Sequence, residues 1–213
     1  MDQKIICFDV DCTVTPGISW DTLTRGLGAS LPTHQRMYKD AQKGILEYRE
    51  FENKLKNLYL KTGNAISYNI IQIFDSIKPF PEAHTLFTHL NRHGFHIYLV
   101  SSGAEIFVSC VAQKLPGVTG FYGNGKIEFG FNKEISQIHF IKNQGQEKVR
   151  ALREIALKHG VSTKDIYFVG DGDNDIDAFK ETGKGIAVHT KSLNLSMVAW
   201  KICEKLTDVQ KLF

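Results

Sequence analysis

The 213-residue sequence lacks several features that mark large classes of protein. No stretch reaches the roughly 18 apolar residues of a membrane-spanning helix, and the first apolar run, Ile5–Phe8, is too short for a signal-peptide core. The four cysteines show no CxxC spacing, which argues against a zinc site or a disulfide framework and favours a reducing, cytoplasmic home. The net charge of +3 is too small to indicate a nucleic-acid or membrane partner.

Three common motifs for phosphate binding and catalysis are also missing. The sequence contains no GxxxxGK[ST] loop, no GxGxxG fingerprint and no GxSxG elbow. What remains is an ordinary globular composition, with 42% hydrophobic and 23% charged residues. The length allows a single domain, or a core domain that carries a smaller insertion.

Short apolar runs alternate with segments of helical periodicity. Apolar residues recur on one face before Gly94 and again before Gly160, and each glycine is typical of a helix end. Strands that alternate with helices predict an α/β fold, a doubly wound parallel sheet whose ligands gather beyond the carboxyl ends of the strands. The predicted buried strands are Lys4–Phe8, His96–Val100, Ile166–Val169 and Gly185–Val188.

One region interrupts this alternation. About 85 residues separate the first two predicted strands, far more than a simple crossover needs. Helical periodicity fills this region, and the breakers Thr15-Pro16-Gly17 and Lys78-Pro79-Phe80-Pro81 bracket it. We therefore predict a helical cap over residues 17–78, inserted into a core made of residues 1–16 and 79–213.

A second irregularity lies at residues 121–129. The Asn124-Gly125 pair between apolar residues favours a type I′ turn, so we predict a β-hairpin centred on it, beside the main sheet.

Acidic residues follow the first predicted strand. Asp9 and Asp11 lie two apart, so both point to the same face at the strand's carboxyl end. Two carboxylates this close repel one another, and a hard divalent cation such as Mg²⁺ relieves that repulsion. The alternative interpretation is a turn of solvated carboxylates, which is common in proteins.

A denser acidic cluster follows the strand predicted over Ile166–Val169. Its residues Asp171, Asp173 and Asp175 hold alternate positions, as in a calcium-binding loop. That interpretation fails, because Ile176 stands where such a loop needs glycine and Thr182 where it needs glutamate. Two acidic clusters after two separate strands predict a single metal site that both strands share.

Hydroxyl groups follow the strand predicted over His96–Val100. Ser101 and Ser102 precede a predicted helix, where hydroxyls and backbone N–H groups suit a phosphoryl oxygen. The alternative is an ordinary serine N-cap. A cationic partner would complete a phosphate site. We favour Lys148, because a lysine at a helix start opposes the helix dipole; Lys133 and Lys142 are its rivals.

Taken in chain order, these motifs resemble those of the haloacid dehalogenase superfamily, and within it the phosphoserine-phosphatase-like branch. Asp9-Val-Asp11-Cys-Thr13 is similar to the DxDxT first motif, and Gly170-Asp-Gly-Asp-Asn-Asp175 matches the GDGxND fourth motif. Ser101 follows an apolar strand as the second motif does, and Lys148 resembles the third. The helical insert after the first motif also resembles the branch's short cap.

The resemblance implies roles for these residues. Asp9 would be the nucleophile that forms an aspartyl-phosphate, and Asp11 the acid and base that serves the leaving alcohol and then the water. Mg²⁺ would be held by the Asp9 carboxylate, the Asp11 backbone carbonyl and Asp171, with Asp175 steadying the metal's surroundings.

The remaining roles concern the phosphoryl group and the leaving group. Ser101, Ser102, Lys148 and Asn174 would bind the transferring phosphoryl group and offset its charge. The cap would close over the site and select the alcohol, with Trp20 in contact with the leaving group.

The sequence departs from the branch in the region that selects the substrate. Phosphoserine phosphatases place a glutamate where this sequence has Ile18, and an arginine around Leu55, where this sequence has Asn53-Lys54-Leu55-Lys56. We therefore expect a leaving group other than serine.

The expected protein is a Mg²⁺-dependent phosphatase for a small phosphomonoester, working as a monomer or homodimer. A phosphotransferase or phosphomutase of the same superfamily is the first alternative. A receiver-like phospho-acceptor is the second, and the length and the order of the motifs speak against it.

Overall fold

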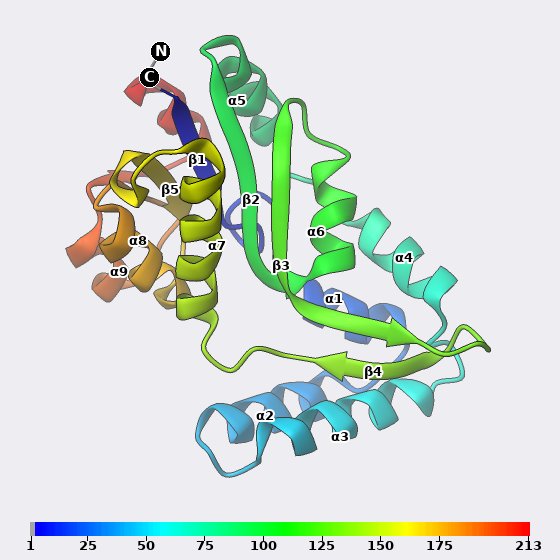
Figure 1. The fold of residues 1–213 in the computed structure, drawn as a ribbon. Coiled ribbons are helices and arrows are strands. Elements are labelled where there is room, and N and C mark those ends of the chain that lie inside the picture. Colours follow the sequence, from blue (N-terminus) through cyan, green and yellow to red (C-terminus); the bar gives the residue numbers. More distant parts are fainter. Residues whose placement is uncertain (1–2) are drawn as a thin grey trace.

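The computed structural model describes residues 3–213. One seven-stranded sheet runs through it in the order β4-β3-β2-β1-β5-β6-β7 (Figure 1). Every neighbouring pair is parallel except β3 with β4. This confirms the predicted α/β fold with a mainly parallel sheet. The strands are β1 (Lys4–Phe8), β2 (Phe95–Ala104), β3 (Val118–Phe129), β4 (Ile135–His139), β5 (Ile166–Gly170), β6 (Gly185–Val188) and β7 (Lys201–Cys203).

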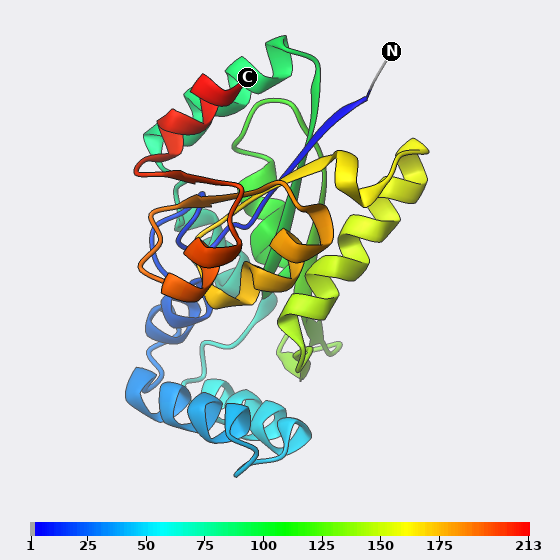
Figure 2. The ribbon, with the colours of Figure 1, turned by 90° about the vertical axis from the view of Figure 1, so that its left-hand side faces the viewer.

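Helices cover both faces of the sheet (Figures 1 and 2). The side chains of β1 alternate between two apolar clusters: Ile6 and Phe8 pack on one face, Ile5 and Cys7 on the other. Both faces of β1 are therefore buried, which explains its unbroken apolar sequence. The helices are α1 (Ser19–Gly26), α2 (Leu31–Gln42), α3 (Tyr48–Leu60), α4 (Ser67–Ser76), α5 (Pro81–Arg92), α6 (Glu105–Ala112), α7 (Gln144–His159), α8 (Ile176–Thr182) and α9 (Leu193–Val198), with short 3₁₀ turns at Thr163–Asp165, Asp173–Asp175 and Leu206–Leu212.

The prediction of a turn at Asn124-Gly125 is wrong, because both residues lie within the continuous strand β3. The reversal of the chain comes later, where residues 130–134 join β3 to the antiparallel β4. Close packing, and not a turn, explains the glycines at positions 123 and 125. A Cβ on Gly123 would lie 2.5 Å from the backbone of Glu105, and one on Gly125 would lie 2.7 Å from the ring of Trp20.

The segment between β1 and α5 holds the four helices α1 to α4. α1 and α4 pack against each other, and α4 also packs against α6. α2 and α3 form an antiparallel pair away from the parallel strands, and α3 packs against the edge strand β4 (Figures 1 and 2). The inserted residues therefore face the outer half of β3 and β4 as well as the sheet's carboxyl edge. No helix within residues 3–213 combines the length and the apolarity needed to cross a bilayer.

Candidate active site

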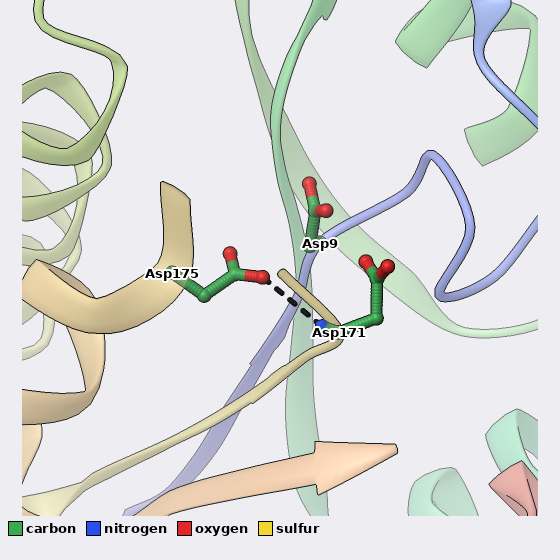
Figure 3. A group of neighbouring side chains, drawn as sticks. All are labelled: Asp9, Asp171 and Asp175. Carbon is green, nitrogen blue, oxygen red and sulfur yellow. Dashed lines mark hydrogen bonds between the residues drawn. The ribbon is translucent and has the colours of Figure 1, made fainter. Parts of the chain in front are cut away.

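The floor of the site is built where β1 and β5 end side by side. Phe8 pairs with Val169, and the next backbone N–H, that of Asp9, donates to the Val169 carbonyl at 2.9 Å. The chain after β5 then brings two more acids to the same edge. One carboxylate oxygen from each of Asp9, Asp171 and Asp175 lies within 4.8 Å of the others (Figure 3). Acids 162 positions apart thus converge as the parallel strands dictate.

Lys148, from α7, lies among these acids and is fully buried. Its Nζ is 3.0 Å from the Asp9 carboxylate and 2.6 Å from the Asp175 carboxylate. Burial lowers the pKa of Lys148, but the charges of Asp175 and Asp9 outweigh this effect and raise it above its ordinary value. The ammonium group therefore stays charged, and the rival Lys133 and Lys142 are both exposed.

The loop after β5 is held by hydrogen bonds to carboxylates. Asp175 accepts from the backbone N–H groups of Asp171 at 3.0 Å and Gly172 at 3.1 Å, while Thr13 donates to Asp171 at 2.9 Å. A Cβ on Gly170 would lie 2.4 Å from the Asp175 carboxyl group, so only glycine fits there. The positions of the acids are therefore fixed before any ligand enters.

The charge balance of this floor calls for a cation. Three carboxylates face one ammonium group, that of Lys148. The pKa of Asp9 is raised well above its ordinary value, mainly by burial. The charge of Lys148 lowers this pKa, while the charges of Asp175 and Asp171 raise it further. Burial and the charge of Asp175 raise the pKa of Asp171 in the same way. A hard divalent cation with oxygen ligands fits this set of donors, since it offsets the carboxylate charge that one lysine leaves.

Asp11 is held apart from that cluster. Its two carboxylate oxygens accept from the backbone N–H of Ser19 at 3.0 Å and from the Ser19 hydroxyl at 2.8 Å. Ser19 is the first residue of α1, so the first inserted helix is tied directly to this acid. Burial raises the pKa of Asp11 to about 7, despite the two bonds from Ser19 that lower it. A carboxyl group poised near neutral pH can both give and take a proton.

The predicted phosphate-binding residues lie along the same edge. Ser101 is buried and Ser102 half-buried, both within β2, which continues to Ala104. Neither caps α6, whose N-cap is Ala104, so the alternative of an ordinary serine N-cap is wrong. The Asn174 amide approaches the Ser102 hydroxyl at 3.4 Å. Both serines and Asn174 border one cavity with Asp9 and Asp171.

This cavity has a volume of about 550 Å³, a size that suits a small molecule. Its inner wall is the acidic floor. Its outer wall comes from the inserted helices and from the chain between β4 and α7, with Trp20 packed on Phe140 at 4.5 Å between ring centroids. Ile18 borders the cavity, whereas Lys56 lies in a separate groove between α3 and β4. The other residues of the outer wall are Asp21, His34, Gln35, Tyr38, Lys39, Gln42 and Gln144.

Sequence reasoning missed most of the outer wall. Nothing in the spacing of Ser19, His34 or Gln144 distinguishes them from ordinary helical residues. Thr13 was part of a recognised motif, yet its bond to Asp171 depends on how the two loops meet. Within residues 17–78, the sequence pointed to Ile18 and Trp20, and both border the cavity.

Comparisons with known proteins match this architecture. A family model described as haloacid dehalogenase-like hydrolase matches residues 3–183. A phosphoserine phosphatase of Methanocaldococcus jannaschii is 26% identical over 201 residues, which cover 90% of this chain and 88% of that protein. One of Archaeoglobus fulgidus is 26% identical over 194 residues, and here the chain spans only 54% of the relative's length. A solved substrate-bound phosphoserine phosphatase complex superposes with a TM-score of 0.78 at 24% identity, over 100% of this chain and 99% of that one, which shows a shared fold.

Proposed function

The chain belongs to the haloacid dehalogenase-like hydrolase family, and on this premise we propose that it is a Mg²⁺-dependent phosphomonoesterase acting on a small phosphorylated metabolite. The phosphatase names of the relatives support this activity. The single observation that carries the proposal is the placement of Asp9. Its buried carboxylate borders a small-molecule cavity, beside a charged lysine and two further acids.

In the first step an Asp9 carboxylate oxygen attacks the phosphorus of the bound ester. A bond forms between that oxygen and phosphorus while the bond from phosphorus to the alcohol oxygen breaks. Asp11 gives its proton to the departing alkoxide, so that a neutral alcohol leaves. A pKa of about 7 supplies the protonated form of Asp11 at neutral pH.

In the second step Asp11, now ionised, removes a proton from a water molecule as that water attacks the aspartyl-phosphate. The bond from phosphorus to Asp9 breaks, inorganic phosphate forms, and both carboxyl groups return to their starting states. Ser101, Ser102, Asn174 and the Lys148 ammonium group orient the phosphoryl oxygens and offset their charge, which is the main demand of this chemistry.

We propose that Mg²⁺ is held by the Asp9 carboxylate, the Asp11 backbone carbonyl and Asp171, with Asp175 fixing Asp171 and Lys148 around it. When bound, the ion supplies positive charge that polarises the phosphoryl group. Lys148 and the backbone N–H groups around Asp175 keep the carboxylates in place for it.

The remaining expectations are proposals of the same kind. Residues 17–78 act as a cap that closes over the cavity, excludes bulk water and selects the alcohol. The enzyme works in the cytoplasm as a monomer or homodimer, which cell fractionation and light scattering test. Ile18 in place of an acid, and Asn53 and Lys56 on either side of Leu55 in a separate groove, support a leaving group other than serine.

The test is a phosphate-release screen over many metabolite phosphoesters, after chelation and again after Mg²⁺ is restored. We expect release only with the cation, and a preference for a small ester other than phosphoserine. Candidate acceptor alcohols are added in parallel, because a transfer product in place of free phosphate would make the protein a phosphotransferase. No turnover of any ester with Mg²⁺ would contradict the proposal.

A further inference from the structure

The outer wall of the cavity contains a histidine whose hydrogen bonds are only half used. His34 lies on α2, is 4% exposed and borders the cavity. Its Nδ1 lies 2.7 Å from the Thr24 hydroxyl. The other ring nitrogen, Nε2, has no hydrogen-bond partner in the described part of the chain, and it is not among the polar atoms sealed from solvent.

The surroundings of Thr24 determine which ring nitrogen carries the proton. A hydroxyl has one proton to donate, and the Thr24 hydroxyl lies 2.7 Å from the Trp20 carbonyl oxygen, which can only accept. Thr24 therefore accepts in its two other contacts, from His34 Nδ1 and from the Tyr59 hydroxyl at 2.8 Å. His34 must carry its proton on Nδ1.

The imidazole ring is neutral in this setting. Burial lowers the pKa of His34, and Asp21 raises it by a smaller amount. The His34 ring lies beside the rings of Phe51 and Tyr59, with centroids 6.1 and 6.3 Å from its own. A neutral ring with Nδ1 protonated has a free lone pair on Nε2, so an acceptor is held rigidly at the cavity wall.

His34 differs from the other acceptors of the outer wall, the side chains of Asp21, Gln35, Gln42 and Gln144, in being buried, so its ring is held in one place. Trp20, Tyr38 and Phe140 make much of it aromatic. The one carboxylate contributed by the inserted helices, Asp21, is half-buried and accepts from the Gln35 amide at 2.8 Å through one of its two oxygens. A bound molecule that displaces water from Nε2 leaves this acceptor unpaired, at a free-energy penalty, unless the molecule brings a donor of its own.

We propose that His34 is a specificity-determining residue, whose Nε2 accepts a hydrogen bond from an O–H or N–H group carried by the leaving alcohol. The inference rests on the proposed function, since the leaving group is that of a phosphomonoester. It names the substrate class more narrowly: an alcohol with a second hydrogen-bond donor, such as a diol or an amino alcohol. Thr24 and Tyr59 are positioning residues that fix the tautomer.

The kinetic test uses three esters that share the same three-carbon chain: propyl phosphate, 3-hydroxypropyl phosphate and 3-aminopropyl phosphate. His34→Phe keeps the ring but removes the acceptor, and His34→Gln restores an oxygen near the position of Nε2. We expect His34→Phe to lower kcat/KM about tenfold for the ester whose donor fits, through KM, and less than twofold for propyl phosphate. His34→Gln should recover most of the loss. His93→Phe, at an exposed position directly after α5, is the control and should change nothing.

The pattern of results separates the possible failures. A selective loss of activity on 3-hydroxypropyl phosphate identifies the donor as a hydroxyl group. A selective loss on 3-aminopropyl phosphate identifies it as an ammonium group. Equal losses on all three esters, or no loss on any, overturn the role of His34 while the phosphatase proposal stands. Absence of turnover of all three by the unaltered protein, with the metabolite screen also negative, refutes the phosphatase proposal itself.

A second measurement avoids variants that fail to fold. Nitrogen NMR of the unaltered protein, labelled in its histidine rings, should show His34 with Nδ1 protonated and Nε2 bare. Adding 3-hydroxypropylphosphonate or 3-aminopropylphosphonate should shift the Nε2 resonance, whereas propylphosphonate should leave it in place. A proton on Nε2 in the free protein, or the same shift with all three ligands, contradicts the inference.

Discussion

The two walls of the cavity are built on different physical principles. The inner wall consists mainly of charged side chains, and its polar groups are bonded to one another: Lys148 to Asp9 and Asp175, and Thr13 to Asp171. The outer wall is aromatic and amide-rich, and it keeps open hydrogen-bonding positions at His34 Nε2 and at the buried indole nitrogen of Trp20.

This difference separates two tasks. A bonded and charged wall is preorganised, so it can stabilise the same transferring group in every substrate. A wall with unmet hydrogen bonds discriminates between molecules by what they bring to it. Changes on the inner wall should therefore lower activity on all substrates, and changes on the outer wall should alter the ranking of substrates.

The largest effect is expected at the inner wall. Asp9→Asn removes the proposed nucleophile with little change of shape, so turnover of a generic aryl phosphate should fall at least about 1000-fold. The measurement is phosphate release at saturating Mg²⁺, with circular dichroism to show that the fold is kept. Wild-type rates in this variant would mean that Asp9 is not the nucleophile.

Lys148→Met should affect both activity and stability. It leaves the buried Asp9 and Asp175 carboxylates without their cation, so we expect a loss of about 3–5 kcal/mol in the free energy of unfolding and about 100-fold in kcat on every ester. Denaturant unfolding and steady-state kinetics measure the two. Lys142→Met, at an exposed position, is the matched control and should stay within about 0.5 kcal/mol. Equal stability of the two variants would show that the buried charge is not needed.

Ser19→Ala tests the link between the two walls. The Ser19 hydroxyl donates to Asp11 and favours its ionised form, so removing it should raise the pKa of Asp11 above about 7. Because the first step needs protonated Asp11, kcat/KM for an alkyl phosphate falls as pH rises through that pKa. This alkaline limb should move up by roughly one pH unit in the variant.

Thr22→Val on the same helix is the control for that experiment, since Thr22 bonds only to the Ile18 carbonyl. If the alkaline limb of the kcat/KM profile does not move in Ser19→Ala, a group other than Asp11 sets the pH dependence.

The smallest effect is expected on the outer wall. Trp20→Phe keeps an aromatic ring against Phe140 but removes the indole N–H. The ratio of kcat/KM for a larger metabolite ester to kcat/KM for the smallest phosphoester should therefore change by about two- to tenfold. The measurement is the ratio of the two kcat/KM values. The exposed Trp200→Phe should leave this ratio unchanged. Equal losses on both esters would reject a role of Trp20 in selection.

The same contrast explains what could be predicted. The strand Lys4–Phe8 and the acids that follow it could be predicted, because apolar runs and clustered carboxylates are properties of neighbouring residues. The turn at Asn124-Gly125 was misjudged for the opposite reason. Gly125 is small because the Trp20 ring, from a helix more than 100 positions earlier, packs against it. A local pattern carries no information about such a contact.

The linear order of residues by itself determined the α/β sheet and the acids that end its strands. Apolar strands buried on both faces are typical of a parallel sheet, and the parallel neighbours β1 and β5 bring their carboxyl ends together. Only the tertiary structure decided that the Ser19 hydroxyl donates to Asp11, and that Thr24 bonds to His34 Nδ1 and so leaves Nε2 available. These contacts depend on where the inserted helices pack, which many weak interactions between distant segments settle together and no short stretch encodes.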